Sequence, residues 1–198
     1  MQNRDKILKI AFDEFMMKGY ESSSINSICQ KAGISKGGIY HHFKNKDELY
    51  QACLNIFLKQ MESWVLEMMQ STINLKEFLF AYFGLMSQVK DELFGANNLE
   101  GFSAANYYTM ILNGATRYPA MQKQLNDTYE QMVEDIQKLI LEAQSKGKIK
   151  QDMDVEITAF ELVSLFEGTL IMSVMKTSLD LEDIGTRLAE NFWNKIKI

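Results

Sequence analysis

Apolar residues recur at helical spacing along most of the chain, and short stretches that contain Gly or small polar residues interrupt them. Near the N-terminus this pattern predicts a helix from about residue 3 to about residue 18, ended by Gly19. A second helix of two to three turns follows. Ser23 or Ser24 can cap its start, and Gly33 can close it in the left-handed conformation that suits glycine.

A third short helix is predicted over residues 36–42, where Ser35 can cap it after a three-residue turn. Two short helices joined by a turn that contains Gly are typical of a helix-turn-helix, whose second helix enters the major groove of DNA. Gly37 and Gly38 each cost about 1 kcal/mol relative to Ala inside a helix. Their missing side chains would let the backbone lie close to DNA, or else let this helix pack tightly on the first one.

The rest of the chain predicts six longer helices, so the expected fold class is all-α. They cover about residues 46–70, 75–93, 103–112, 119–146 and 155–175, with a final helix from about residue 181. A single Pro and eleven Gly agree with this, because a loop-rich β fold needs many more turn residues.

The helix predicted over 155–175 is apolar around most of its circumference, and Glu161 and Glu167 are its only charges from residue 159 onward. A surface that wide must be covered on two sides. Packing of this helix and the last one against the same pair of a second copy would form a two-fold four-helix bundle, and burial within one chain is the alternative. The residues expected at the dimer interface are Phe160, Val163, Leu170, Val174, Ile184, Leu188 and Phe192.

The formal net charge is −5, but it is unevenly distributed. Residues 1–50 carry eight basic and six acidic side chains, so their net charge is +2 and that of the remainder is −7. No carboxylate lies between Glu21 and Asp47, whereas four lysines and both histidines do. A basic, acid-free segment on an acidic body is typical of a phosphate-binding surface, although a solvated surface stretch would have the same composition.

This segment also carries the donors that bind phosphates and the edges of DNA grooves. They are Lys36, Tyr40, His41, His42 and Lys44. Asn45 can cap the next helix, whose first turn contains Lys46. A lysine beside the unpaired N–H groups of a helix start is suited to clamp a phosphate, although it opposes the helix dipole.

Many spaced positions agree with one family pattern: Gly19-Tyr20, Ser23-Ser24-Ile25, Ile28-Cys29 and the run from Ala32 to Leu49. This N-terminal quarter resembles the DNA-binding domain of the tetracycline-repressor (TetR) family. That family consists of dimeric, ligand-responsive transcriptional regulators, most of them repressors. The resemblance implies a helix-turn-helix DNA-binding domain over 1–46 and a helical ligand-binding and dimerisation domain over 47–198, and a double-stranded operator as partner.

Carried over by position, the resemblance implies three groups of DNA contacts. Ser24 and Asn26 would lie at the DNA-facing start of the second helix; Lys36, Gly37 and Gly38 would face the groove; Tyr40, His41 and Lys46 would hold phosphates. His42 joins them by its chemistry. The chain departs from the pattern at Gly38, where members often have Thr or Ala, and at Cys29, where they have Ala.

Ten of the thirteen methionines lie beyond residue 50, mixed with aromatic residues. Methionine adapts to varied apolar partners, so with the resemblance we expect an internal pocket for a flat or elongated apolar effector; an ordinary core is the alternative. The expected lining residues are Trp64, Met68, Phe83, Met86, Tyr107, Tyr108, Met132 and Phe166.

Other classes of function find little support in the sequence. It contains no catalytic or nucleotide-binding motif, and Cys29 and Cys53 are expected in the core, so we expect no enzyme, no cofactor and no metal. The apolar stretch 162–175 is too short to span a membrane, and the charged N-terminus is unlike an export signal, which suggests a cytoplasmic protein. The rival hypothesis is a helical protein that binds a lipophile or a partner and has lost DNA binding.

Overall fold

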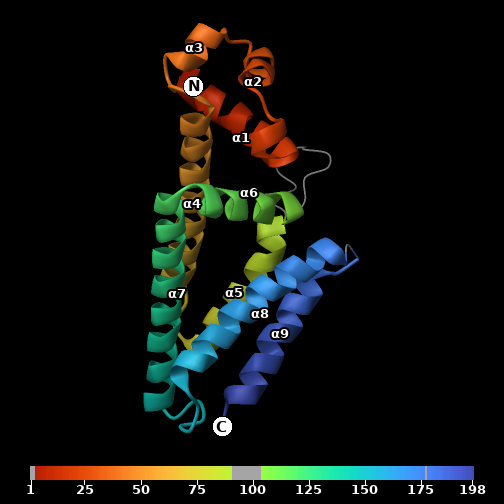
Figure 1. The fold of residues 1–198 in the computed structure, drawn as a ribbon. Coiled ribbons are helices and arrows are strands. Elements are labelled where there is room, and N and C mark those ends of the chain that lie inside the picture. The colour runs from red at the N-terminus through yellow and green to blue at the C-terminus, as the bar shows by residue number, and fades with distance from the viewer. Residues whose placement is uncertain (1–2, 91–103, 177) are drawn as a thin grey trace. The chain divides into compact units, whose positions relative to one another are not determined.

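The computed structural model describes residues 3–90, 104–176 and 178–198, which are mostly helical (Figure 1). The helices are α1 (Asn3–Ser22), α2 (Ile25–Ala32), α3 (Lys36–Tyr40), α4 (Lys46–Ser71), α5 (Leu75–Lys90), α6 (Ala104–Arg117), α7 (Pro119–Ser145), α8 (Val155–Met175) and α9 (Leu181–Ile196). The all-α fold is confirmed. Residues 91–93 and 103, which were predicted at helix ends, lie outside the described part of the chain.

The predicted caps set several helix boundaries. Ser24 caps α2 through its side chain, which accepts a hydrogen bond from the Ser27 N–H, and Gly33 ends that helix at φ 64°. Gly19 leaves the helical conformation at φ 73°, so the regular part of α1 ends where predicted. Asp154 caps α8 and accepts from the Ile157 N–H. Each of these contacts satisfies a terminal backbone group that the helix itself cannot pair.

Two helices differ from their predicted lengths. α3 ends at Tyr40 rather than at residue 42, and the chain turns there to bury Phe43. α6 continues to Arg117, five residues past the predicted end. Its Gly114 allows close packing, because a Cβ there would lie 2.4 Å from the Met121 sulfur. A glycine inside a helix usually weakens it, and here close packing favours it.

The chain divides into two compact units. The first comprises residues 1–61 and 99–125, so its described part contains α1, α2, α3, the start of α4, α6 and the start of α7. Within this unit α1 packs against α2 and α6, and the Asn106 amide donates to the Met16 carbonyl at 2.9 Å. The division predicted at residue 46 falls where α4 begins, but it separates α1 from α6, and it stays a prediction.

The second unit comprises residues 62–98 and 126–198. Its main packing joins α5 to α9, which lie side by side, and α8 also contacts α5 (Figure 1). Gly185 of α9 makes the close approach possible, because a Cβ there would lie 2.6 Å from the Phe83 carbonyl oxygen. This unit therefore has its own core of α5, α8 and α9.

α8 is longer than the apolar stretch 162–175, from which no membrane span was expected. It is 21 residues long, and an 18-residue window within it has a mean hydropathy of 1.5, enough by length and composition to cross a membrane. The predicted stretch 162–175 was shorter because it omitted the first turns of the helix. A core helix of a water-soluble protein passes the same test, so this composition is weak evidence for a membrane span.

Candidate nucleic-acid interface

The helix-turn-helix brings two capped helix starts to the surface of the first unit. Ser24, the cap of α2, is exposed, and so is Asn26 in its first turn. Ser35 caps α3 and accepts from the Gly38 N–H at 3.1 Å. Lys36, the first residue of α3, is also exposed. Three of the predicted DNA-contacting residues, Ser24, Asn26 and Lys36, therefore lie at or next to helix starts, where the helix dipole favours an anion such as phosphate.

The surroundings of the two adjacent glycines of α3 differ. A Cβ on Gly37 would meet only the Ser35 hydroxyl, at an ordinary 3.8 Å. A Cβ on Gly38 would lie 2.5 Å from Cγ2 of Ile34, which is too close. Packing against Ile34 therefore explains Gly38, and among the described residues no close contact explains Gly37. The absence of a side chain at Gly37 fits the close approach of another molecule.

The end of α3 presents the aromatic and imidazole groups. Tyr40 is half exposed, and His41 is exposed in the turn that follows. His42 is partly covered, and its ring lies edge-on to that of His41, with centroids 5.0 Å apart. Hydroxyl and imidazole groups in such positions can reach a phosphate.

The first turn of α4 holds Lys46 in a defined position. Asn45 caps the helix by accepting from the Glu48 N–H at 2.8 Å, and the Glu48 carboxylate accepts from the Lys44 N–H at 2.7 Å. The Lys46 ammonium lies 4.1 Å from the centre of the Tyr20 ring. A cation over an aromatic face keeps its charge while its position is restricted, which suits a phosphate clamp.

An Asp47-centred cluster, which the sequence did not reveal, lies next to Lys46. Asp47 accepts hydrogen bonds from the hydroxyls of Tyr20 (2.9 Å) and Tyr118 (2.7 Å) and from Nε of Arg117 (3.2 Å). The Tyr118 hydrogen bond, together with that of Tyr20 and the Arg117 charge, lowers the pKa of Asp47. The Arg117 guanidinium also lies over the Tyr20 ring, at 4.0 Å. The α6–α7 corner is thus tied to the start of α4.

A second missed feature, the Glu14 network, joins α1 to α2. Glu14 is fully buried, and its carboxylate pairs with Lys18 at 2.8 Å and Lys31 at 2.5 Å and accepts from the Ser27 hydroxyl at 2.7 Å. Burial alone would raise the pKa of Glu14, but the hydrogen bonds from Lys18, Lys31 and Ser27 outweigh it and lower the pKa to about 2. The sequence offered one signal for this network, because Glu14 is a carboxylate on the apolar face of the first predicted helix.

The predicted effector residues of the second unit lie in its core. Met68, Phe83, Met86, Met132 and Phe166 are all buried. Tyr82 joins three of them: its ring stacks on Phe166 with centroids 4.6 Å apart, it contacts Phe83, and its hydroxyl lies 4.0 Å from the Met132 sulfur. The core therefore has the adaptable Met and aromatic composition that was expected, and its role in binding an effector stays a prediction.

The remaining effector candidates belong elsewhere. Tyr108 is partly exposed in the first unit. The side chains of Trp64 and Tyr107 lie outside the described residues.

The predicted dimer residues divide into two sets. Phe160 is 62% exposed, and Val174, Ile184 and Leu188 are partly exposed. Val163, Leu170 and Phe192 are buried within the single chain, so in this structure they belong to the core of the second unit. The exposed apolar residues that accompany Phe160 on α8 are Ile157, Leu165, Ile171, Met172 and Met175.

Within residues 3–90, 104–176 and 178–198, no group of three or more His, Cys, Asp or Glu side chains is arranged to hold a metal ion. The two cysteines are free, with Cys53 buried and Cys29 partly buried.

Two family models match this chain. Residues 7–53 match the model described as bacterial regulatory proteins, tetR family, and residues 110–185 match a tetracyclin repressor-like C-terminal domain. The chain belongs to the TetR family. The first match covers α2, α3 and the start of α4, so the exposed helix starts described above belong to the DNA-binding domain of a transcriptional regulator.

Individual relatives agree with membership of the TetR family. The HTH-type transcriptional regulator UidR of Escherichia coli is 28% identical over 84% of this chain and 79% of its own length. QacR of Staphylococcus aureus, also an HTH-type transcriptional regulator, is 35% identical over 39% of this chain and 42% of its own. A TetR transcriptional regulator from Chloroflexus aurantiacus shares the fold, with a TM-score of 0.76, 20% identity and coverage of 99% and 96% of the two chains.

Proposed function

We propose that this TetR-family regulator is a repressor that binds a palindromic operator as a homodimer and is released when a small apolar molecule enters its body. The observation that carries the DNA-binding part is the exposed start of α3. Lys36 and Gly37 are exposed there, and the space around Gly37 requires no glycine for packing. Lys46, ten residues further along the chain, places its ammonium group over the Tyr20 ring.

In this proposal, different side chains supply the specificity for the operator sequence and the general affinity for DNA. Lys36, at the start of the recognition helix, reads base edges, because lysine ammonium groups pair with the acceptors of guanine in the major groove. Lys46, Tyr40 and His41 bind phosphates, and Ser24 and Asn26 hold the start of α2 against the sugar-phosphate backbone of the DNA. Phosphate contacts position the protein on any sequence, whereas groove contacts select the operator.

Homodimerisation is supported by the exposed apolar face of α8. Phe160 and Met172 are each more than half exposed, and Met175 is 85% exposed, which is costly for a helix left in water. Two copies of this face in contact would bury it and present two recognition helices about 34 Å apart, or a multiple of that distance, to a palindrome. A cytoplasmic location agrees with the transcriptional role of the relatives.

An apolar effector is supported by the Met and aromatic core around Tyr82. The same fold in FadR of Bacillus subtilis, at 18% identity and a TM-score of 0.66 over 95% of this chain and 96% of that one, was solved in complex with stearoyl-CoA. Release requires that the effector bind the DNA-free arrangement of the dimer more tightly than the DNA-bound one.

DNA binding by the full chain tests this function. Fluorescence anisotropy with duplexes from the region flanking its own coding sequence should give a specific complex that weakens steeply with salt. Unlabelled operator should displace the probe, and a shuffled duplex of equal length should not. If no duplex gives a specific, salt-sensitive complex, that result contradicts the proposed DNA binding and favours the rival function, that of a lipophile- or partner-binding protein without DNA binding.

A further inference from the structure

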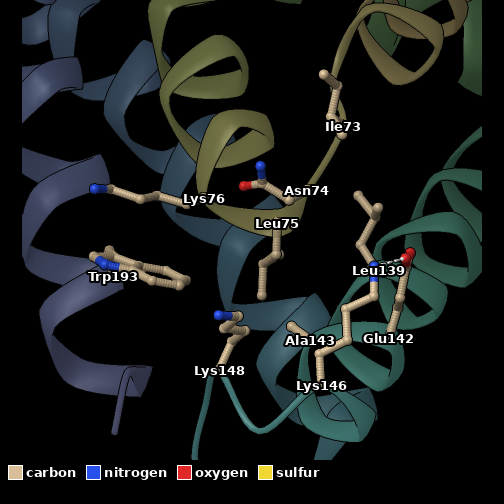
Figure 2. Close-up of a pocket in the computed structure, with 10 residues that line it drawn as sticks. All are labelled: Ile73, Asn74, Leu75, Lys76, Leu139, Glu142, Ala143, Lys146, Lys148 and Trp193. Carbon is tan, nitrogen blue, oxygen red and sulfur yellow. Dashed lines mark hydrogen bonds and ion pairs between the residues drawn. The ribbon is translucent and has the colours of Figure 1, made fainter.

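The second unit contains a pocket that none of the predicted effector residues lines. It lies between the start of α5, the last turns of α7 with the loop that follows, and α9, and its volume is about 390 Å³ (Figure 2). Small-molecule sites in proteins usually have volumes of about 300–1,000 Å³. Leu75 and Ala143 are buried beside it, and Trp193 contributes a partly exposed indole ring. The pocket is therefore large enough for a ligand of one or two fused rings.

The pocket carries a surplus of positive charge. Lys76, Lys146 and Lys148 line it, and Glu142 is its one acidic lining residue. Glu142 is already neutralised, since it pairs with Lys146 at 2.5 Å. Among the described residues, no carboxylate pairs with Lys76 or with Lys148. Two ammonium groups thus remain uncompensated in a body whose overall charge is negative.

The two uncompensated lysines lie around the aromatic ring. The Lys76 ammonium is 5.9 Å from the centre of the Trp193 ring. Figure 2 shows Lys76 and Lys148 on opposite sides of that ring in this view, with Leu75 between Trp193 and Leu139. An indole face favours a planar apolar group, and an ammonium group close to that ring favours a negative charge attached to the planar group.

We propose that this pocket is a binding site for a small planar molecule with one acidic group, such as an aromatic carboxylate. The rings of the ligand would pack on Trp193 and Leu75, and the charges of Lys76 and Lys148 would attract its carboxylate from either side of the ring (Figure 2). The site is separate from the core around Tyr82, and it depends neither on DNA binding nor on the identity of the apolar effector. Occupancy would hold α5, α7 and α9 together and so stabilise the second unit.

Titration of the full chain with 1-naphthaleneacetate tests the proposal. Isothermal calorimetry should give saturable binding with a Kd below about 1 mM. The neutral analogue 1-naphthaleneacetamide should bind at least fivefold more weakly. In ¹⁵N spectra the indole N–H signal of Trp193, assigned with a Trp64→Phe chain, should shift as the probe saturates. Equal affinity for the two probes, or a Trp193 signal that does not move, would overturn the proposal.

Charge-reversal variants identify the residues. Lys76→Glu combined with Lys148→Glu should weaken 1-naphthaleneacetate binding at least tenfold, while Lys176→Glu, an exposed lysine outside the pocket, should change it less than twofold. Circular dichroism checks that all variants remain folded. Should misfolding prevent the comparison, the single variant Lys148→Gln replaces the double one, with at least a threefold loss expected. If affinity is the same in parent and variants, the carboxylate binds elsewhere and the assignment is wrong.

Discussion

Gly37 and Gly38 are neighbours in α3, yet different forces favour them. Gly38 avoids a contact of 2.5 Å with the Ile34 side chain, whereas Gly37 has room for a methyl group and is exposed. From the sequence we expected both glycines to allow either a close approach to DNA or tight packing against the first helix. A pair of glycines carries no information about which side chain is nearby, so the two positions could not be distinguished. The structure shows that Ile34, in the preceding turn, is the neighbour that matters for Gly38.

Gly37→Ala separates stability from DNA binding. Alanine should raise the free energy of unfolding by up to about 1 kcal/mol, because it is the better helix former and meets no close contact. The same methyl group should lower operator affinity at least fivefold, measured by anisotropy beside urea denaturation. Gly38→Ala is the matched control, and we expect it to gain no stability because of Ile34. Unchanged operator affinity in Gly37→Ala would remove the argument for a close approach at Gly37.

Lys46 and Lys36 should differ in the kind of binding they lose. Lys46→Ala should weaken operator and random duplexes by the same factor and reduce the slope of log K against log salt by about 1. Lys36→Ala should lower the ratio of operator affinity to random-duplex affinity. The corresponding loss of discrimination should be about 1–3 kcal/mol in binding free energy. Lys59→Ala, an exposed lysine on α4, is the control and should bind as the parent does. Identical effects of the Lys36 and Lys46 substitutions would contradict their separate roles.

At the scale of elements, the Glu14 network fixes α2 on α1. Removal of a buried carboxylate leaves its partners without their acceptor, and here they come from both helices: Lys18 from α1, Lys31 and Ser27 from α2. Neither lysine is itself buried, since their side chains are 47% and 52% exposed. Within this network, the free-energy cost of removing a charged group from water therefore falls mainly on Glu14.

The Glu14 network should make stability depend on acid. The folded pKa of Glu14, about 2, lies below its ordinary value of 4.5, so the network stabilises the folded chain above pH 4.5 and this contribution is lost as the pH falls from 4.5 to 2. Glu14→Gln should lower the free energy of unfolding at pH 7 by up to about 3 kcal/mol. The difference from the parent should shrink over the same range of pH.

Urea denaturation at pH 7, 4.5 and 3 measures this dependence. Glu190→Gln, which removes an exposed carboxylate on α9, is the control and should leave the parent's pH profile unchanged. A Glu14→Gln chain that loses stability with acid as steeply as the parent would show that other carboxylates govern the transition.

At the scale of the whole molecule, α8 is the element whose environment decides the assembly. One side of it belongs to the core of the second unit, where Leu162 and Leu170 are buried, and the other side exposes Phe160, Met172 and Met175. The sequence predicted cover on two sides from the width of the apolar surface. The structure provides cover on one side, and in our proposal a second copy provides the other.

Phe160→Glu should convert the dimer to a monomer. A carboxylate in the centre of an apolar contact would be desolvated without a partner, which is far more costly than leaving it in water. Light scattering should show a mass near 22.8 kDa in place of twice that value. Operator affinity should fall at least tenfold, because a monomer has one DNA-binding domain and contacts only one of the two half-sites of the operator.

Leu141→Glu is the matched control for Phe160→Glu, since Leu141 is 54% exposed on α7, and it should leave both the mass and the operator affinity unchanged. A Phe160→Glu chain that remains dimeric would place the interface on another surface.

Local patterns in the sequence were enough to predict most of the helices and several of their caps. Helical spacing, Ser24, Gly33 and Asp154 act within one or two turns of chain, so α2 and α8 begin where predicted. Tertiary structure decided what depends on distant partners. Asp47 accepts a hydrogen bond from Tyr118, 71 residues away, and Val163 and Phe192, which were predicted at a dimer interface, are buried within their own chain. Periodicity shows which side chains are apolar, and packing alone decides which surface covers them.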